Sequence, residues 1–324
     1  MYGLRHAWTL LMRRIETRVW QRANIFRTLG DTARARGSAS SDVDEFSARI
    51  GARPALPSSR YECKYLLRPE QLAGVRRFVA PFVAPDRYAQ RHVDHTYPVV
   101  SSYLDSPDLR LHGMTAMGSK TRFKLRVRTY GDAFPDTAFL EIKKRYNGIV
   151  LKDRVALDAA SAAELLAVRP RVALNGLGRR LDGRATDVVY RFLTLCRLLD
   201  ARRVIVMRYM REAYESHGIE PVRITFDTAL EYAVLGRPSA LVAPRRWVRA
   251  RLAGPVLEIK FTERSPGWVR QLVRTFELDR RSVPKYVTCV DQALATGRLV
   301  TDRRAAHPLV DLAGLLSLGR SFDG

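Results

Sequence analysis

The stretch between residues 121 and 155 constrains the fold most, because apolar and charged side chains alternate there in three successive runs. A period of two residues makes each run a strand with one apolar and one charged face. Asn147 and Gly148 separate the second run from the third, and this dipeptide is typical of a tight hairpin. The charged members are Lys124, Arg126, Arg128, Glu141, Lys143, Arg145, Lys152 and Arg154. So many cations around one Glu predict a sheet face that binds a strongly anionic ligand.

The same period and chemistry recur in four further segments, which are residues 60–65, 203–214, 223–227 and 256–261. A single basic strand could be a solvated face that arose by chance. In three of the four segments, however, a carboxylate shares a face with the cations. Many strands with such a shared polar face are easier to enclose in a closed barrel than to leave exposed to water. We therefore expect an α+β fold in which helices flank an antiparallel β-barrel with a polar, phosphate-binding lumen.

The charge balance points to a polyanionic partner, because 56 Lys and Arg stand against 33 Asp and Glu, a formal net charge of +23. Nucleic acid, an anionic membrane surface and condensed phosphate all satisfy this charge, which does not choose among them. Cys63, Cys196 and Cys289 are an odd number of cysteines without zinc-site spacing, which favours a reducing compartment. We expect all three to be core residues. Neither a membrane span nor a signal peptide is recognisable, so we expect a cytoplasmic protein.

The composition divides the chain into three parts. Residues 1–59 are interpreted as a basic amphipathic helix followed by a linker rich in small residues. This helix either contacts a membrane or a membrane subunit, or is an ordinary packing helix or an upstream extension. Residues 60–300 are expected to form the folded domain, and residues 301–324 a tail. Within the domain, helices are predicted at about residues 68–79, 105–117, 158–168, 185–199, 266–277 and 284–295.

Six short motifs occur in order along the domain. They are Tyr61-Glu62-Cys63-Lys64-Tyr65, Ser102-Tyr103-Leu104-Asp105-Ser106, Lys124-Leu125-Arg126-Val127-Arg128-Thr129-Tyr130, Leu140-Glu141-Ile142-Lys143-Lys144, Val256-Leu257-Glu258-Ile259-Lys260 and Ser282-Val283-Pro284-Lys285-Tyr286-Val287. Together they resemble the VTC domain, the polyphosphate polymerase domain of the vacuolar transporter chaperone complex and of bacterial homologues. The resemblance covers about residues 60–296, and its strength lies in the ordered set, since each motif alone is weak.

The resemblance implies a triphosphate tunnel fold, in which an eight-stranded antiparallel barrel binds a triphosphate and a divalent metal. It implies a metal-dependent polymerase that transfers the γ-phosphate of ATP to a growing polyphosphate chain and releases ADP. The implied cofactor is Mn²⁺ or Mg²⁺, and the implied partners are ATP and inorganic polyphosphate, with no specific nucleic acid. Carried over position by position, the catalytic and substrate-binding cations are Lys64, Arg126, Arg128, Lys143, Lys152, Arg211, Arg223 and Lys285.

Three further positions follow from the same comparison of residues. Glu258 matches the metal-binding glutamate, and Lys260 either lines the tunnel, which is the favoured role, or pairs with Glu258. Glu141 is either a second metal ligand or an ion-pair partner that orients lumen cations. Strict alternation places Arg211 on the face of Tyr209, so we expect a bulge or strand break before Arg211 can face inward.

Two other functions remain open at this stage. Related tunnel enzymes hydrolyse inorganic or organic triphosphates, and many of them begin with an ExExK pattern. Here Arg60 stands where the first Glu of that pattern would be, which favours the polymerase. The other alternative is a non-catalytic polyphosphate-binding module. A nucleic-acid-binding barrel is disfavoured, because the basic strands carry few interleaved aromatic side chains on which bases could stack. The sequence does not predict the oligomeric state.

Overall fold

The computed structural model describes residues 60–131, 136–146, 149–167, 181–217, 221–235, 244 and 246–302. The predicted N-terminal helix and linker therefore lie outside the described residues, as do the Asn147-Gly148 turn and nearly all of the tail. The division of the chain into these parts stays a prediction. In the described part of the chain, no helix is long and apolar enough to cross a membrane.

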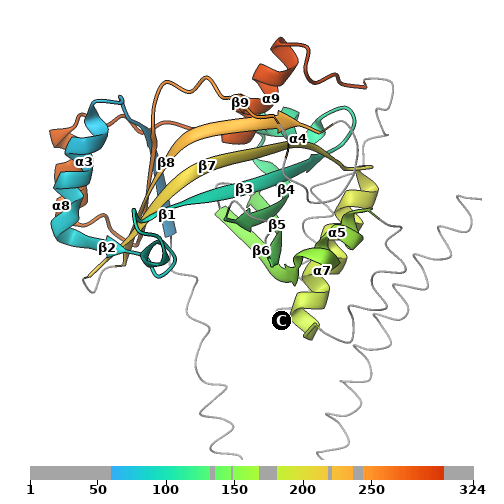
Figure 1. Cartoon of the computed structure of the whole chain (residues 1–324), viewed down its shortest axis with the longest axis horizontal. Helices are drawn as coiled ribbons and strands as arrows, with labels where there is room; N and C mark the ends of the chain where they lie inside the picture. The colour runs from blue at the N-terminus through green and yellow to red at the C-terminus, as the bar shows by residue number, and fades with distance from the viewer. Residues whose placement is uncertain are drawn as a thin grey trace, which may run out of the picture. The chain divides into compact units, whose positions relative to one another are not determined.

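Eight antiparallel strands form one continuous path in the order β1-β10-β8-β7-β3-β4-β5-β6 (Figure 1). Their bounds are β1 (Arg60–Leu66), β3 (Thr96–Asp105), β4 (Thr121–Tyr130), β5 (Thr137–Tyr146), β6 (Ile149–Asp158), β7 (Arg202–Ser216), β8 (Val222–Val234) and β10 (Val256–Thr262). Two short strands lie off this path, since β2 (Val83–Pro85) pairs with β7 and β9 (Val248–Arg249) pairs with β8. Among the described residues no pairing joins β1 to β6, so the sheet is a curled half-barrel. The predicted antiparallel, eight-stranded architecture with flanking helices is confirmed.

The helices flank the sheet close to their predicted positions. They are α3 (Gln71–Val79), α4 (Arg110–Ala116), α5 (Ala159–Ala167), α7 (Gly183–Leu198), α8 (Gly267–Thr275) and α9 (Lys285–Ala295), with 3₁₀ turns η2 (Ala80–Phe82) and η3 (Ala89–Arg91). Side-chain caps fix two of the starts. Asp158 accepts a hydrogen bond from the Ser161 amide at 2.8 Å before α5, and Asp182 accepts one from the Ala185 amide at 2.6 Å in α7.

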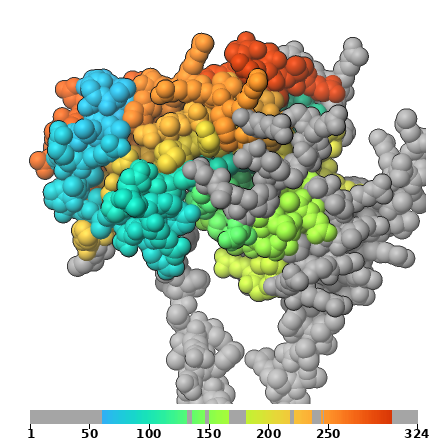
Figure 2. All heavy atoms as spheres, viewed as in Figure 1, coloured from blue at the N-terminus to red at the C-terminus, as the bar shows by residue number. Residues whose placement is uncertain are grey.

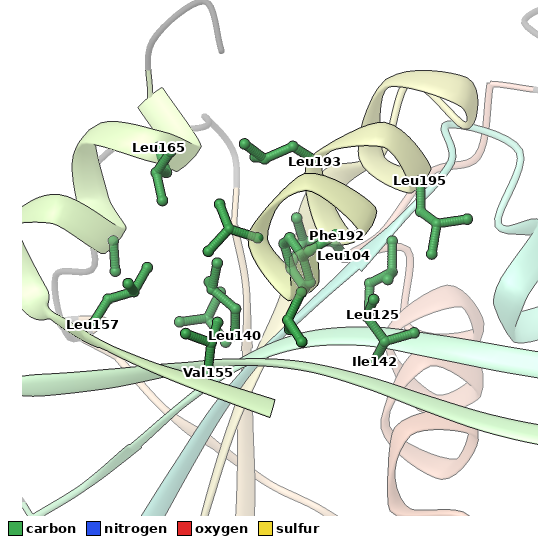
Figure 3. Close-up of a cluster of buried hydrophobic side chains, with 14 of the residues drawn as sticks. Leu104, Leu125, Leu140, Ile142, Val155, Leu157, Leu165, Phe192, Leu193 and Leu195 are labelled. Atoms are coloured by element: carbon green, nitrogen blue, oxygen red, sulfur yellow. The ribbon is translucent and has the colours of Figure 1, made fainter. Parts of the chain in front are cut away.

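Two hydrophobic clusters cover the outer face of the sheet. In the first, α5 and α7 pack on β4, β5 and β6, with Phe192 of α7 against strand residues such as Leu125 and Leu140 (Figure 3). In the second, Val75 of α3 and Leu272 of α8 pack on β1, β8 and β10. Figure 2 shows α3 in blue and the α9 region in red at the surface, separated by strand residues in orange and yellow.

The third cluster lies where α9 packs on β7 and β3. Ile205 and Tyr209 of β7 pack there with Val290 of α9, and the ring of Tyr103 in β3 stacks on Tyr286 with centroids 4.7 Å apart. Because α9 begins at Lys285, this packing also fixes the position of the Lys285 ammonium group. Cys63 and Cys289 are buried in the second and third clusters, as expected of core cysteines.

The register of β7 explains how Arg211 is placed. A register shift between β7 and β8 does occur at the predicted point. Two residues of β8, Ala229 and Leu230, lie opposite the single residue Tyr209 of β7, and Ala229 has a φ of 50°. Against β3, however, the pairing is regular at this point, with Val99 opposite Tyr209 and Tyr97 opposite Arg211, and the register shift of this ladder lies further along, between Tyr103 and Leu104. Arg211 therefore shares a face with Tyr209, and the expectation that a bulge must separate their faces is wrong. An apolar residue such as Tyr209 can lie on the inner face because α9 covers part of this face with apolar contacts.

Candidate functional site

The strand registers bring the predicted cations onto one face. Lys64 lies opposite Glu258, and Arg126 lies opposite Glu141. Lys143 of β5 lies opposite Lys124 of β4 on one side and Lys152 of β6 on the other. This face is the inner face of the curl, because Lys143 of β5 lies within ion-pair distance of Glu62 in β1. The inner face carries three carboxylate centres, at Glu258, Glu141 and Asp227.

The first centre is Glu258 in the middle of β10. Lys260 Nζ lies 2.5 Å from its Oε1, and Lys64 Nζ lies 3.4 Å from its Oε2. Glu62 also contacts Lys64, so two carboxylates share this ammonium group. Burial opposes ionisation of Glu258, but Lys260, Lys64 and Arg211 outweigh it and hold its pKa well below the usual range. Burial likewise disfavours charge on Lys64, yet Glu258 and Glu62 raise its pKa.

The second centre is Glu141 in β5, whose side chain is fully buried. Arg126 Nε lies 2.5 Å from its Oε2. Lys152 Nζ and Arg154 Nε lie 2.8 and 3.4 Å from its Oε1, within ion-pair distance although not in hydrogen-bond geometry. Burial would raise the pKa of Glu141, but Arg126, then Arg128 and Lys152, lower it to about 2. Glu141 is therefore a permanent anion that orients three cations.

The third centre is Asp227 in β8, also fully buried. Arg211 binds it through two parallel hydrogen bonds, 2.6 Å from Nε to Oδ1 and 2.8 Å from Nη2 to Oδ2. Lys285 Nζ lies 2.6 Å from the same Oδ2. Burial opposes ionisation, but Lys285 and Arg211 lower the pKa of Asp227. A bidentate contact and a second cation hold this carboxylate rigidly.

The remaining predicted cations are held by other partners. Arg128 is buried and donates hydrogen bonds to Ser101 Oγ at 3.1 Å and Tyr209 OH at 3.2 Å. Arg223 donates to Asp86 Oδ2 and Glu215 Oε1, each at 2.5 Å. Arg128 thus has hydroxyl groups as its hydrogen-bond partners, whereas two carboxylates balance the charge of Arg223.

The resemblance left three residues of this site unassigned, although Lys124 and Arg154 are among the charged members of the alternating runs. Asp227 binds the predicted cations Arg211 and Lys285 directly. Arg154 lies within ion-pair distance of Glu141, and Lys124 stands on the inner face opposite Lys143. The signal was available in each case, because each residue alternates in phase with predicted neighbours such as Arg126 or Arg223. Of the three carboxylate centres, Glu258 and Glu141 were named from the sequence, whereas Asp227 was not.

A divalent metal fits Glu258 better than Glu141. Glu258 and Glu62 lie on either side of Lys64, and Thr225, opposite Glu258, has a buried Oγ1 with no hydrogen-bond partner. Such oxygens suit Mg²⁺ or Mn²⁺, which need few protein ligands when phosphate and water complete the shell. Across the described residues no group of three or more His, Cys, Asp or Glu could hold a metal by itself. The three cations around Glu141 favour the ion-pair role of the two left open for it.

Fold and site together define a protein whose curled antiparallel sheet encloses a face of buried, paired charges with an excess of cations. The VTC domain matches residues 59–294, and the chain belongs to this family. The resemblance indicated by the ordered motifs is thereby confirmed.

Among solved structures, the chain is similar to a putative adenylyl cyclase from Hippeastrum, described as having a dominant triphosphatase activity. The two are 15% identical over 75% of this chain and 98% of that one, with a TM-score of 0.41. It is also similar to the PH1819 protein from Pyrococcus horikoshii OT3, at 13% identity over 72% of this chain and 99% of that one, with a TM-score of 0.36. No curated protein matches the chain.

Proposed function

We propose that the protein is a metal-dependent polyphosphate polymerase that transfers the γ-phosphate of ATP to a growing polyphosphate chain and releases ADP. The observation that supports this proposal is the inner face of the sheet, where cations from seven strands and α9 converge in a member of the VTC domain family. The cations are Lys64, Lys124, Arg126, Arg128, Lys143, Lys152, Arg154, Arg211, Arg223, Lys260 and Lys285.

This arrangement suits phosphoryl transfer, which needs little covalent help from a protein. The reaction requires donor and acceptor in line and neutralised charge on the phosphate oxygens. Arg126 and Arg211 are oriented in advance by Glu141 and Asp227, so little reorganisation is needed when a phosphate chain binds. No further nucleophile is required, because the terminal phosphate of the acceptor chain is already an anion.

A bound metal would be held chiefly by Glu258, with Glu62 and the Thr225 hydroxyl as further oxygen donors. The chemistry that Mn²⁺ or Mg²⁺ would supply at these residues is neutralisation of phosphate charge. Lys64 and Lys260 would then be released from Glu258 and become free to bind phosphate.

The test is incubation of the purified protein with ATP, Mn²⁺ and a short polyphosphate primer, with chain length read on a gel and ADP measured. Glu258→Gln removes the charge at the proposed metal ligand, and Glu164→Gln at an exposed position of α5 is the matched control. We expect long chains and stoichiometric ADP from the wild type and the control, but not from Glu258→Gln.

Other outcomes would point to the alternatives. Release of free phosphate without chain growth would support a tunnel triphosphatase acting on inorganic or organic triphosphates. Tight binding of polyphosphate without any product would support a non-catalytic binding module. If Glu258→Gln kept full polymerase activity, Glu258 would not be the metal ligand, but the proposed polymerase function would stand.

A further inference from the structure

Lys124 differs from the other lysines of the inner face. Lys64, Lys143, Lys152, Lys260 and Lys285 each have a carboxylate within 4.0 Å. In the described part of the chain, Lys124 has none. Its ammonium group instead lies 5.8 Å from the centroid of the Tyr286 ring. The buried Arg128 likewise has no carboxylate within 4.0 Å among the described residues, but its guanidinium donates hydrogen bonds to two hydroxyl groups.

The surroundings of Lys124 are predominantly positive. The charged and titratable groups that face it are Lys64 of β1, Tyr103 of β3, Arg126 of β4, Lys143 of β5 and Tyr286 of α9. The hydroxyl of Tyr103 accepts a hydrogen bond from Arg126 at 3.2 Å, which ties it to the same cluster. Carboxylates pair with these three cations, namely Glu62 and Glu258 with Lys64, Glu62 with Lys143, and Glu141 with Arg126. Among the described residues none lies within ion-pair distance of Lys124 itself, so its charge is poorly stabilised.

Titration agrees with this geometry. Burial lowers the pKa of Lys124 to about 8, and Lys143, Lys64 and Arg126 add to the effect against the attraction of Tyr103. Burial opposes ionisation of Tyr103, but Arg126, Lys124 and Arg128 lower its pKa to about 8. Without an anion in the tunnel, Lys124 therefore exchanges its proton near physiological pH.

We infer that Lys124 is a proton-linked phosphate subsite, which takes up a proton from solvent when condensed phosphate binds beside it. This inference takes from the proposed function only that the ligand is condensed phosphate. An anionic phosphate oxygen supplies the counter-charge that the protein lacks here, so binding favours the ammonium form. The proton moves from the buffer to Nζ, and no bond of the phosphate chain breaks. Affinity for phosphate chains should therefore fall as pH rises above about 8.

The test measures proton uptake directly by titration calorimetry. Inorganic triphosphate is titrated into metal-free protein at pH 8, in two buffers of different ionisation enthalpy. Lys124→Arg keeps the charge but cannot release it, because the guanidinium stays protonated. We expect the wild type to take up about half a proton more than Lys124→Arg, since a group at its pKa is half protonated. Protonation of the ligand itself is common to both proteins and cancels in the difference.

Three further variants separate the alternatives. Lys120→Arg, at an exposed position just before β4, should behave as the wild type. Lys124→Met should bind roughly tenfold more weakly at pH 7 and converge with the wild type at pH 10, where the wild-type amine is neutral. Tyr103→Phe should retain most of the uptake.

Equal uptake by the wild type and Lys124→Arg would overturn the inference, as would uptake that disappears in Tyr103→Phe alone. In either case triphosphate would still bind, so the proposed function would stand. Failure of the wild type to bind triphosphate at any pH would instead contradict the proposed function, and the subsite with it.

Discussion

Lys143 of β5 and Glu62 of β1 lie 3.7 Å apart, measured from Nζ to Oε2. Their strands are separated in the sheet by β10, β8, β7, β3 and β4. The curl of the sheet is thus strong enough to bring the two side chains together, although the backbones of the edge strands are not paired. Because the contact is partly exposed, its contribution to stability is small, up to about 1 kcal/mol. Its consequence is electrostatic, since it places a carboxylate between two tunnel lysines.

Removing that carboxylate should strengthen anion binding. Glu62 neutralises Lys64 and Lys143, so Glu62→Gln leaves both with more positive potential toward the tunnel. We expect inorganic triphosphate, titrated in the presence of a chelator, to bind Glu62→Gln roughly 3- to 10-fold more tightly than the wild type. Glu164→Gln should show no change. Unchanged or weaker binding by Glu62→Gln would mean that the ligand does not reach these lysines.

The Asp227 centre should be far more important for stability. Asp227→Asn leaves Arg211 and Lys285 buried without an anion, and we expect a loss of about 3–5 kcal/mol in the free energy of unfolding. Asp279→Asn breaks a solvent-exposed pair with Arg281 and should cost less than about 1 kcal/mol. Urea denaturation compares the two. Similar small losses for both would show that the buried centre is not needed for folding.

Period-two patterns predicted the strands well where they were long. The three runs between residues 121 and 155 became β4, β5 and β6, and their charged residues share the inner face. By contrast, β2 and β9 were not predicted, because strands of three and two residues are too short to show a period. Asp105 begins the helix predicted at about residues 105–117, but in the structure it ends β3 and accepts hydrogen bonds from the Leu111 and His112 amides. That helix begins later than predicted, after Leu109 with a φ of 58°.

The partners within the site were not predictable from the same patterns. Alternation tells which face a residue occupies, but contacts across the tunnel depend on the curl of the whole sheet. Asp227 and Lys285 are 58 residues apart, and Asp86 and Arg223 are 137 residues apart. The face of Tyr209 was misjudged for the same reason. Its apolar side chain suggested the outer face, whereas α9 packs against it on the inner side.

Glu141 should give the protein a characteristic acid sensitivity. Its pKa of about 2, against an ordinary value of 4.5, means that the carboxylate stabilises the fold above about pH 4.5 and that this contribution is lost as pH falls toward 2. The difference amounts to about 3 kcal/mol. Glu141→Gln should therefore be clearly less stable than the wild type at pH 5, with most of the gap closed by pH 2.5 and the rest lost below pH 2. Urea denaturation at several pH values measures this gap, and a constant gap would contradict the assignment.

Gly254 links the stability of the fold to the position of Glu258. A Cβ atom at Gly254 would lie 2.0 Å from the carbonyl oxygen of Leu67, and the Leu67 amide donates a hydrogen bond to Pro255 at 2.9 Å. This close approach fixes the start of β10, which carries Glu258. We expect Gly254→Ala to lose about 1–3 kcal/mol of unfolding free energy and to reduce polymerase activity, because the backbone must shift.

The matched control is Gly183→Ala. Gly183 is the first residue of α7, and a Cβ there has no atom within 4 Å. Alanine favours helix over glycine by up to about 1 kcal/mol, so this variant should be as stable as the wild type or more so, with unchanged activity. Thermal denaturation and the chain-growth assay measure both effects. If Gly254→Ala kept full stability but lost activity, the contact between Gly254 and Leu67 would position Glu258 without stabilising the fold. If it kept both, the contact with Leu67 would be able to relax, and the start of β10 would not depend on a glycine.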